Sequence, residues 1–186
     1  NRRPGRRIQT AQKDRTAVSR MSAIVGGGNG FVVERVCVVR PLLIELEDFG
    51  SFAGSHGLDL SGVSRAAVVG ENGAGKSTLV YDALGFALAG VTRAGDTDSV
   101  VRTGAEQGRV AVTFEVDGTS YRVTRVRQRA KKTSAWVEKA DPGSATGWET
   151  VTESKGVRET DECVAGLLGA SWDALAATVF AGQGDA

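Results

Sequence analysis

The 186-residue chain is poor in cysteine and histidine, and it has no long apolar run. Its two cysteines, Cys37 and Cys163, lie far apart without a C-x-x-C spacing, so neither a disulfide framework nor a zinc site is expected, and a reducing cytoplasm fits better. The single histidine, His56, has no metal-ligating neighbours and is expected in a solvated loop. No run approaches the ~20 apolar residues of a membrane-spanning helix, so no membrane partner is expected.

Positive charge is concentrated at the start of the chain. Residues 1–40 hold nine Lys/Arg and two Asp/Glu, whereas residues 41–186 hold fourteen and twenty. Residues 1–39 are therefore expected to be a disordered basic leader, which could bind nucleic acid, or a mis-assigned start such as an over-extended reading frame or an expression remnant; the second interpretation is favoured. A secretory signal is not supported, because the apolar residues 23–25 run straight into a glycine-rich stretch.

The chain does contain a phosphate-binding loop. Gly70 to Thr78 fit the pattern G-x-x-x-x-G-K-[ST]. The apolar run Ala66–Val69 before it predicts a buried strand, and apolar residues at helical spacing from Leu79 to Leu88 predict a helix that stops at Gly90. The residues expected to bind the nucleotide are Gly70, Asn72, Gly73, Ala74, Gly75, Lys76, Ser77 and Thr78.

These residue types suit phosphate chemistry. The glycines let successive backbone N–H groups point at phosphate oxygens, and the start of the following helix adds partial positive charge. Lys76 can reach the β- and γ-phosphates, and the Ser77 hydroxyl can hold Mg²⁺. A glycine-rich turn with a chance Lys-Ser is the alternative, which the flanking strand and helix patterns disfavour. The loop alone does not distinguish an ATPase from a GTPase or a small-molecule kinase.

The second half of the chain predicts an antiparallel sheet followed by helices. Apolar residues alternate from Val110 to Val116, and Asp117-Gly118 is a favoured two-residue hairpin turn, which would pair Phe114 with Tyr121 and Val112 with Val123. The other expected elements are a strand alternating from Ile44, a short strand Leu58–Leu60, strands Thr133–Lys139 and Trp148–Thr152, a helix from Val157 ending at Gly169, and a helix Trp172–Ala177 capped by Ser171.

Six basic residues crowd into eleven positions between Arg122 and Lys132. Arg125, Arg127, Arg129 and Lys131 share one parity, so a continuing strand would place them in a row on one face. Such a row could follow the phosphates of double-stranded DNA without reading bases. The alternative is a solvated hairpin tip whose charges pair with Glu115 or Glu138.

A series of motifs carries a family resemblance. In order, the chain has Phe49-Gly50-Ser51-Phe52 after a strand, the phosphate loop, Val101-Arg102-Thr103-Gly104, the hairpin, Leu167-Leu168-Gly169 and Val179-Phe180-Ala181-Gly182-Gln183-Gly184-Asp185. Over about residues 40–186 this resembles the N-terminal ATPase lobe of the SbcC family, which comprises ABC-type ATPases related to the structural-maintenance-of-chromosomes proteins. The implied fold class is α/β, a P-loop NTPase with an attached antiparallel β-sheet, and the implied unit 40–186 is the N-terminal half of an ABC-ATPase head, truncated after the Q-loop.

The resemblance also implies roles for single residues. Gln183 would be the Q-loop glutamine that contacts Mg²⁺ and the attacking water, so that Lys76 and Gln183 are the expected catalytic residues, Ser77 and Gln183 the metal ligands, and ATP and Mg²⁺ the cofactors. The turn Phe49–Phe52 would lie beside the nucleotide, and Arg102 would belong to a loop that senses nucleotide or DNA. The family usually has an Asp five residues after the loop lysine, where this chain has Tyr81 and then Asp82, so the helix is expected to be shifted by one residue.

The implied function is that of an ATP-driven component in DNA-end processing during double-strand break repair, acting in the cytoplasm at the nucleoid. The implied partners are a C-terminal ATPase lobe, a second copy of the head in a homodimer, an SbcD-like nuclease and double-stranded DNA. The signature motif, the Walker B acid, the switch histidine and the coiled coil with its zinc hook would all lie downstream, so the chain alone is expected to lack ATPase activity. The alternatives are a structural DNA clamp or recombination ATPase of the chromosome-maintenance type, and a small-molecule phosphotransferase.

Overall fold

A computed structural model describes residues 20–23, 35–63 and 66–179. Their strands pair antiparallel throughout, in the order β1-β2-β4-β5-β6-β7, with β3 also paired to β2. The strands are β1 (Arg20–Ala23), β2 (Arg35–Glu47), β3 (Ser55–Asp59), β4 (Gln107–Val116), β5 (Thr119–Gln128), β6 (Ser134–Ala140) and β7 (Trp148–Thr150). The helical elements are a π-helical turn η1 (Thr78–Asp82), α1 (Ala83–Ala89), a 3₁₀ helix η2 (Thr97–Val100), α2 (Val157–Leu168) and α3 (Trp172–Val179).

The β4–β5 hairpin has the register that the sequence predicts. Phe114 lies opposite Tyr121, and Val112 lies opposite Val123. The turn residues Asp117 and Gly118 both have positive φ, 48° and 78°, as a type I′ turn requires. These observations confirm the predicted hairpin. Its register could be predicted because a two-residue turn leaves only one register that keeps the apolar side chains on one face.

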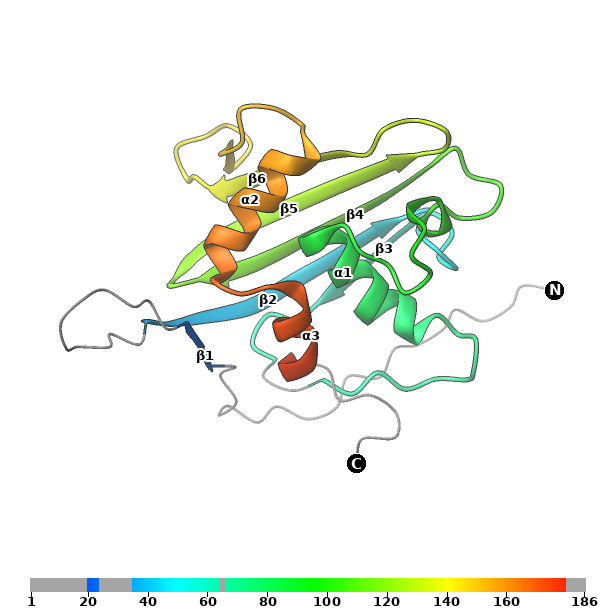
Figure 1. Ribbon diagram of the computed structural model, residues 1–186, viewed down its shortest axis with the longest axis horizontal. Coiled ribbons are helices and arrows are strands. Elements are labelled where there is room, and N and C mark those ends of the chain that lie inside the picture. The colour runs from blue at the N-terminus through cyan, green and yellow to red at the C-terminus, as the bar shows by residue number, and fades with distance from the viewer. Residues whose placement is uncertain (1–19, 24–34, 64–65, 180–186) are drawn as a thin grey trace.

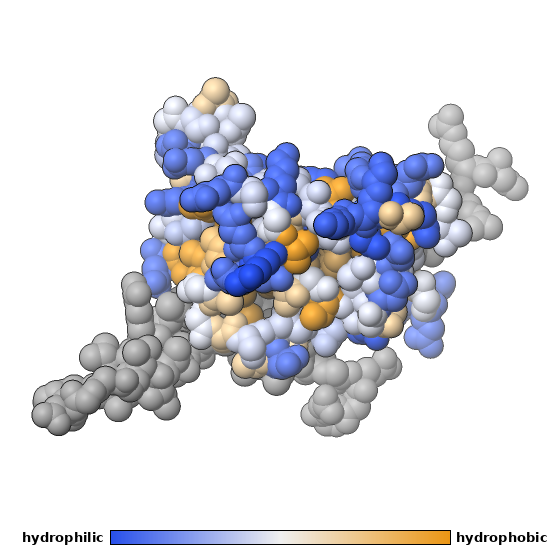
Figure 2. Space-filling model, turned by 45° about the horizontal axis from the view of Figure 1, so that its top comes forward, coloured by the Kyte–Doolittle hydropathy of each residue, from blue (hydrophilic) through white to orange (hydrophobic). Residues whose placement is uncertain are grey.

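The helices cover one face of the sheet. In Figure 1, α1 lies across the middle strands and α2 lies across β5 and β6. Alternate residues of the strands point into this layer and pack against the inner sides of the helices. The core consists chiefly of Ile44, Leu46, Val110, Val112, Phe114, Val123 and Val137 from the sheet, with Ala83, Phe86, Ala87, Val164 and Leu168 from the helices. On the face shown in Figure 2, hydrophilic residues lie among several separate apolar patches.

Both C-terminal helices form where the sequence predicts them. Gly169 ends α2 in the left-handed conformation at φ 65°, which a glycine adopts without strain. The Ser171 hydroxyl accepts a hydrogen bond from the backbone N–H of Ala174 at 3.3 Å and so caps α3. No helix in the described ranges is long and apolar enough to cross a bilayer.

Two expectations about the first half of the chain need correction. Ala66–Val69 is not a strand: it has no regular structure, and Val69 is 68% exposed. A strand needs neighbours for its backbone groups, and none of the described strands pairs with this run. Within the range expected to be a leader, Arg20–Ala23 forms β1 and β2 begins at Arg35, so part of residues 1–39 pairs with the sheet.

The basic row from Arg125 to Lys131 is not a continuous free surface: Arg129 and Lys131 are exposed, but Arg125 is not. Arg125 is fully buried: its Nε donates to the carbonyl of Ala87 at 2.8 Å, and its Nη2 donates to Asp161 of α2. Gly90 leaves room for this guanidinium, since a Cβ there would lie 3.3 Å from Nη1 of Arg125. A cation at the C-terminal end of α1 also meets the negative end of the helix dipole. The interpretation of Arg125 as a DNA contact is therefore wrong.

The neighbouring arginines are engaged as well. Arg127 binds Asp98 at 2.8 Å, and Arg129 donates to backbone carbonyls of the 101–105 segment. Arg122, on the opposite face, binds Glu138 at 2.9 Å through both Nε and Nη2, which is one of the pairings that the alternative interpretation expected. Glu115 pairs instead with Arg40.

Replacing Arg125 should destabilise the fold in a way that depends on the volume of the new side chain. Arg125→Ala leaves a cavity and an unpaired carbonyl at Ala87, so we expect the free energy of unfolding to fall by about 3 kcal/mol. Arg125→Met keeps the packing volume and should cost about 1 kcal/mol, which is the cost of the unpaired Ala87 carbonyl, because Asp161 is 43% exposed and can regain water. Urea unfolding measures both. Arg158→Ala, which breaks an exposed pair with Glu162 on the same helix, is the control and should change little; equal losses in all three variants would contradict this role of Arg125.

Candidate nucleotide-binding site

The segment Gly70–Thr78 forms a tight loop in front of a helix. Gly73 and Gly75 have φ values of 77° and 89°, a region that L-side chains rarely adopt. The backbone N–H of Ala74 donates to Glu71 at 3.1 Å, and that of Leu79 donates to Gly75 at 2.8 Å, which starts the helical hydrogen bonds. Gly73 and Gly75 are therefore needed for the backbone path itself.

Lys76 lies across the start of this loop. Its Nζ donates to the carbonyl of Gly70 at 2.6 Å and to that of Glu71 at 2.9 Å, and Ser77 is exposed. A mobile ammonium held only by two carbonyls can turn to a phosphate, which would offer full negative charge instead of dipoles. The loop residues fit a nucleoside triphosphate with its magnesium ion: they supply a cation, backbone N–H groups at a helix start and an accessible hydroxyl.

The turn Phe49–Phe52 lies directly against the loop. A Cβ at Gly75 would stand 2.5 Å from Oγ of Ser51, and a Cβ at Gly50 would stand 2.5 Å from Cγ2 of Thr78. Neither distance leaves room for a side chain, so the two backbones can approach this closely only because both positions are glycine. The expectation that this turn lies beside the nucleotide site agrees with its place against the loop.

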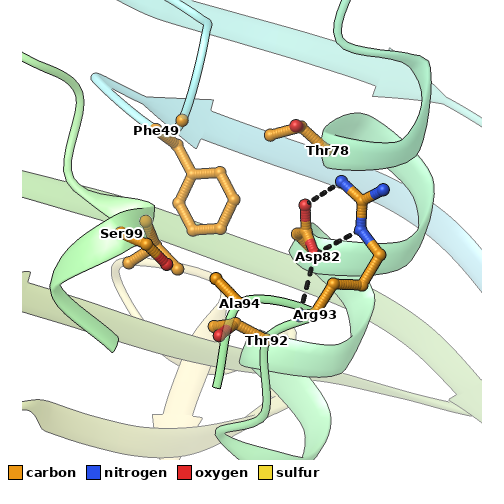
Figure 3. A pocket seen from close by; sticks show the side chains of 9 residues that line it. Phe49, Thr78, Asp82, Thr92, Arg93, Ala94 and Ser99 are labelled. Atoms are coloured by element: carbon orange, nitrogen blue, oxygen red, sulfur yellow. Dashed lines mark hydrogen bonds and ion pairs between the residues drawn. The ribbon is translucent and has the colours of Figure 1, made fainter. Parts of the chain in front are cut away.

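A cavity of about 380 Å³ opens on the flank of the helix that follows the loop. Figure 3 shows Asp82 and Arg93 facing each other at one side of it and Phe49 at the other. Nε and Nη2 of Arg93 donate to the two carboxylate oxygens of Asp82 at 2.9 and 2.6 Å, and this hydrogen bonding raises the pKa of Arg93. The lining residues are Phe49, Gly50, Thr78, Asp82, Thr92, Arg93, Ala94, Ser99 and Val100.

A π-helical turn accounts for the position of Asp82, which comes one residue later than the family pattern has it. The sequence led us to expect that the helix after Ser77 is shifted by one residue. The structure instead has the π-helical turn η1 over Thr78–Asp82, between the loop and α1. Because each π-type hydrogen bond spans one residue more than an α-type bond, one such turn absorbs one extra residue. The helix still ends at Gly90, as predicted, in the left-handed conformation.

The structure brings together most of the predicted site residues, but not all. Gly70 to Thr78 form the loop, whereas Gln183 lies outside the described residues. Arg102 lies near the turn, with its backbone N–H donating to Asp48 at 2.9 Å. The sequence analysis did not single out Arg93 or Ser99, which lie in a polar connector with no motif. An arginine eleven residues after Asp82 gives no periodic signal, and only the folded connector places it opposite that carboxylate.

Comparison with known proteins defines the class. A family model described as an AAA domain matches residues 43–177, and this range contains the phosphate loop, the cavity and the whole β4–β7 sheet. The chain therefore belongs to this family of ATPase domains and is a P-loop nucleoside-triphosphate-binding protein.

Individual relatives narrow the class to SbcC/Rad50-like ATPases. The chain is 37% identical over 134 residues to the C component of the nuclease SbcCD from Deinococcus radiodurans, which covers 69% of this chain and 14% of that protein. It is 30% identical over 120 residues to the DNA double-strand break repair Rad50 ATPase of Thermoplasma volcanium, covering 63% of this chain and 12% of that protein. These matches confirm the resemblance to the SbcC family, and the chain spans less than a sixth of the length of either relative.

The contact between the turn and the loop can be tested with two nearby glycines, one inside the turn Phe49–Phe52 and one two residues after it. Gly50→Ala and Gly54→Ala both place a side chain at positive φ, 56° and 70°, with a similar backbone strain of about 1 kcal/mol. Only Gly50→Ala pushes a methyl group into Thr78, since a Cβ at Gly54 meets nothing within 4 Å. We expect Gly50→Ala alone to weaken binding of a fluorescent ATP analogue, measured by titration. Equal affinities in the two variants would show that the close approach does not matter for the site.

Proposed function

We propose that this chain is the ATP-binding N-terminal lobe of an SbcC-like ATPase that drives DNA-end processing in double-strand break repair together with a nuclease partner. The observation that carries the proposal is the loop Gly70–Thr78, with Lys76 held only by loop carbonyls. ATP with Mg²⁺ would supply the phosphoryl group and its bound metal. Lys76 would neutralise phosphate charge, the Ser77 hydroxyl would hold the metal, and Gln183 would orient the attacking water.

The cavity beside the loop supports binding of a whole nucleotide rather than of phosphate alone. Thr78 belongs both to the loop motif and to the cavity wall, so the cavity adjoins the phosphate site of the loop. The cavity offers an apolar side at Phe49 and Val100 and polar groups at Ser99 and Asp82, a mixture that suits a nucleoside.

The unpaired run Ala66–Val69 supports a site completed by further protein. Directly before the loop glycine, this apolar backbone pairs with none of the described strands, and Val69 exposes a large aliphatic side chain. Strands from a C-terminal ATPase lobe would satisfy these backbone groups. A second head would then face the loop in a homodimer, and a nuclease and double-stranded DNA would be the further partners, in the cytoplasm at the nucleoid.

The first test separates nucleotide binding from hydrolysis. We expect the 186-residue chain to bind Mg²⁺-ATP but to show negligible turnover, because the proposal assigns the water-activating carboxylate and the facing head, which complete transition-state stabilisation, to other parts of the assembly. Lys76→Ala should abolish binding and leave the thermal midpoint nearly unchanged, since Nζ contacts only two loop carbonyls. Calorimetric titration and a phosphate-release assay measure the two properties.

Lys132→Ala is the matched control for Lys76→Ala. Lys132 is an exposed lysine in the turn after β5, so its removal should leave ATP affinity unchanged. Rapid ATP turnover by the isolated chain would contradict a divided site, and ATP binding that survives Lys76→Ala would contradict the assignment of the loop.

A further inference from the structure

Two arginines at the end of β5 hold the segment that connects α1 with β4. Arg129, one residue beyond β5, donates Nη2 to the carbonyls of Val101 and Arg102 at 3.0 and 3.2 Å and Nε to that of Ala105 at 3.0 Å. Arg127 donates Nε to the carboxylate of Asp98 at 2.8 Å. The segment 98–105 is thus anchored by two side chains, one from β5 and one from the residue after it, that lie well apart from it in the sequence.

The segment 98–105 is also hydrogen-bonded to the turn Phe49–Phe52, which touches the phosphate loop. The backbone N–H of Gly50 donates to Val100 at 2.7 Å, that of Arg102 donates to Asp48 at 2.9 Å, and Phe49 and Val101 form an isolated antiparallel bridge. Phe49, Ser99 and Val100 are also cavity walls, and Figure 3 shows Phe49 and Ser99 on the same side of the cavity.

These contacts form a continuous path from β5 to the nucleotide site. Arg129 fixes the 101–105 segment, that segment fixes Phe49 and Gly50, and Gly50 lies against Thr78, where even a methyl group would not fit. A small displacement of the segment would therefore change both the cavity wall and the turn that packs on the loop.

We propose that Arg129, although exposed, is a positioning residue for the nucleotide, with Arg127 as its support. This inference rests on the proposed ATP-binding function. Arginine suits the role because its planar guanidinium presents several donors in a fixed geometry and can bind three carbonyls at once. A lysine at position 129 would keep the charge but could not reproduce that geometry.

Arg122 provides a matched control on the same strand. It too is paired, with Glu138, and its guanidinium lies 4.4 Å from the ring centroid of Trp148. Strand alternation places Arg122 on the face opposite to Arg125 and Arg127, away from the connector. Arg122→Gln should therefore lower the stability of the sheet without changing the position of the segment 98–105.

The experiment measures three quantities in the 186-residue chain: affinity for Mg²⁺-ATP, thermal midpoint and hydrogen exchange of the turn amides. Arg129→Gln should weaken ATP binding about fivefold and accelerate exchange at Gly50 and Arg102, the two amides that join turn and segment. Arg129→Lys should restore only part of the affinity. Arg122→Gln should lower the midpoint while affinity and exchange at these amides stay at the level of the unchanged chain.

Each outcome decides the inference. An affinity and an exchange pattern in Arg129→Gln equal to those of Arg122→Gln would mean that Arg129 is only structural and would overturn it. A loss of affinity for duplex DNA in Arg129→Gln with unchanged ATP affinity would overturn it in favour of the DNA interpretation. If Arg129→Gln does not fold, Asp98→Asn, which weakens the half-exposed partner of Arg127, should give the same changes more weakly. If the unchanged chain shows no ATP binding that depends on Lys76, the proposed function is overturned together with this inference. If the unchanged chain binds ATP and Arg129→Gln binds it equally well, this inference alone is overturned.

Discussion

The close approach of the turn Phe49–Phe52 to the phosphate loop is the constraint on which the site depends. Thr78 occupies the space that a side chain at Gly50 would need, and Ser51 occupies the space that a side chain at Gly75 would need. Through this contact the loop is held by the edge of the sheet as well as by the helix that follows it. The cavity is lined by this turn, by the connector 92–100, and by Thr78 and Asp82 of the helix flank.

The arginines of β5 illustrate how one sequence pattern can serve several physical roles. Their spacing gives a row of equal charges, and such a row is ordinarily solvated. Here Arg125 is removed from water and meets a helix C-terminus and a carboxylate, while Arg127 binds Asp98 and Arg129 binds carbonyls of the 101–105 segment. Burying a cation is costly unless its donors are met. Nε and Nη2 of Arg125 have partners, whereas its buried Nη1 has no hydrogen-bond partner among the described residues. The contacts of Arg125 tie α1 and α2 to β5. The strand thereby joins the core to the nucleotide site.

Local rules predicted those parts of the fold that depend on neighbours in sequence. A two-residue turn with positive φ at both positions set the hairpin register, and glycines at Gly90 and Gly169 ended their helices. The phosphate loop was predicted for the same reason, because its backbone path needs glycine at Gly73 and Gly75. The π-helical turn was not predicted, although Asp82, one place later than the family pattern, was the signal that one extra residue had to be accommodated.

The sequence by itself determined the loop, the hairpin register and the ends of the helices, since each follows from the conformations that a few adjacent residues can adopt. Only the tertiary structure decided whether Ala66–Val69 forms a strand and whether the side chains of the basic row are buried or exposed. An apolar run becomes a strand only if another strand meets its hydrogen-bonding groups, and a charge is surface or core according to what packs over it. Likewise, the pairing of Arg93 with Asp82 and of Arg129 with the 101–105 carbonyls arises between segments that no sequence period relates. Those long-range contacts, rather than any motif, give the site its walls.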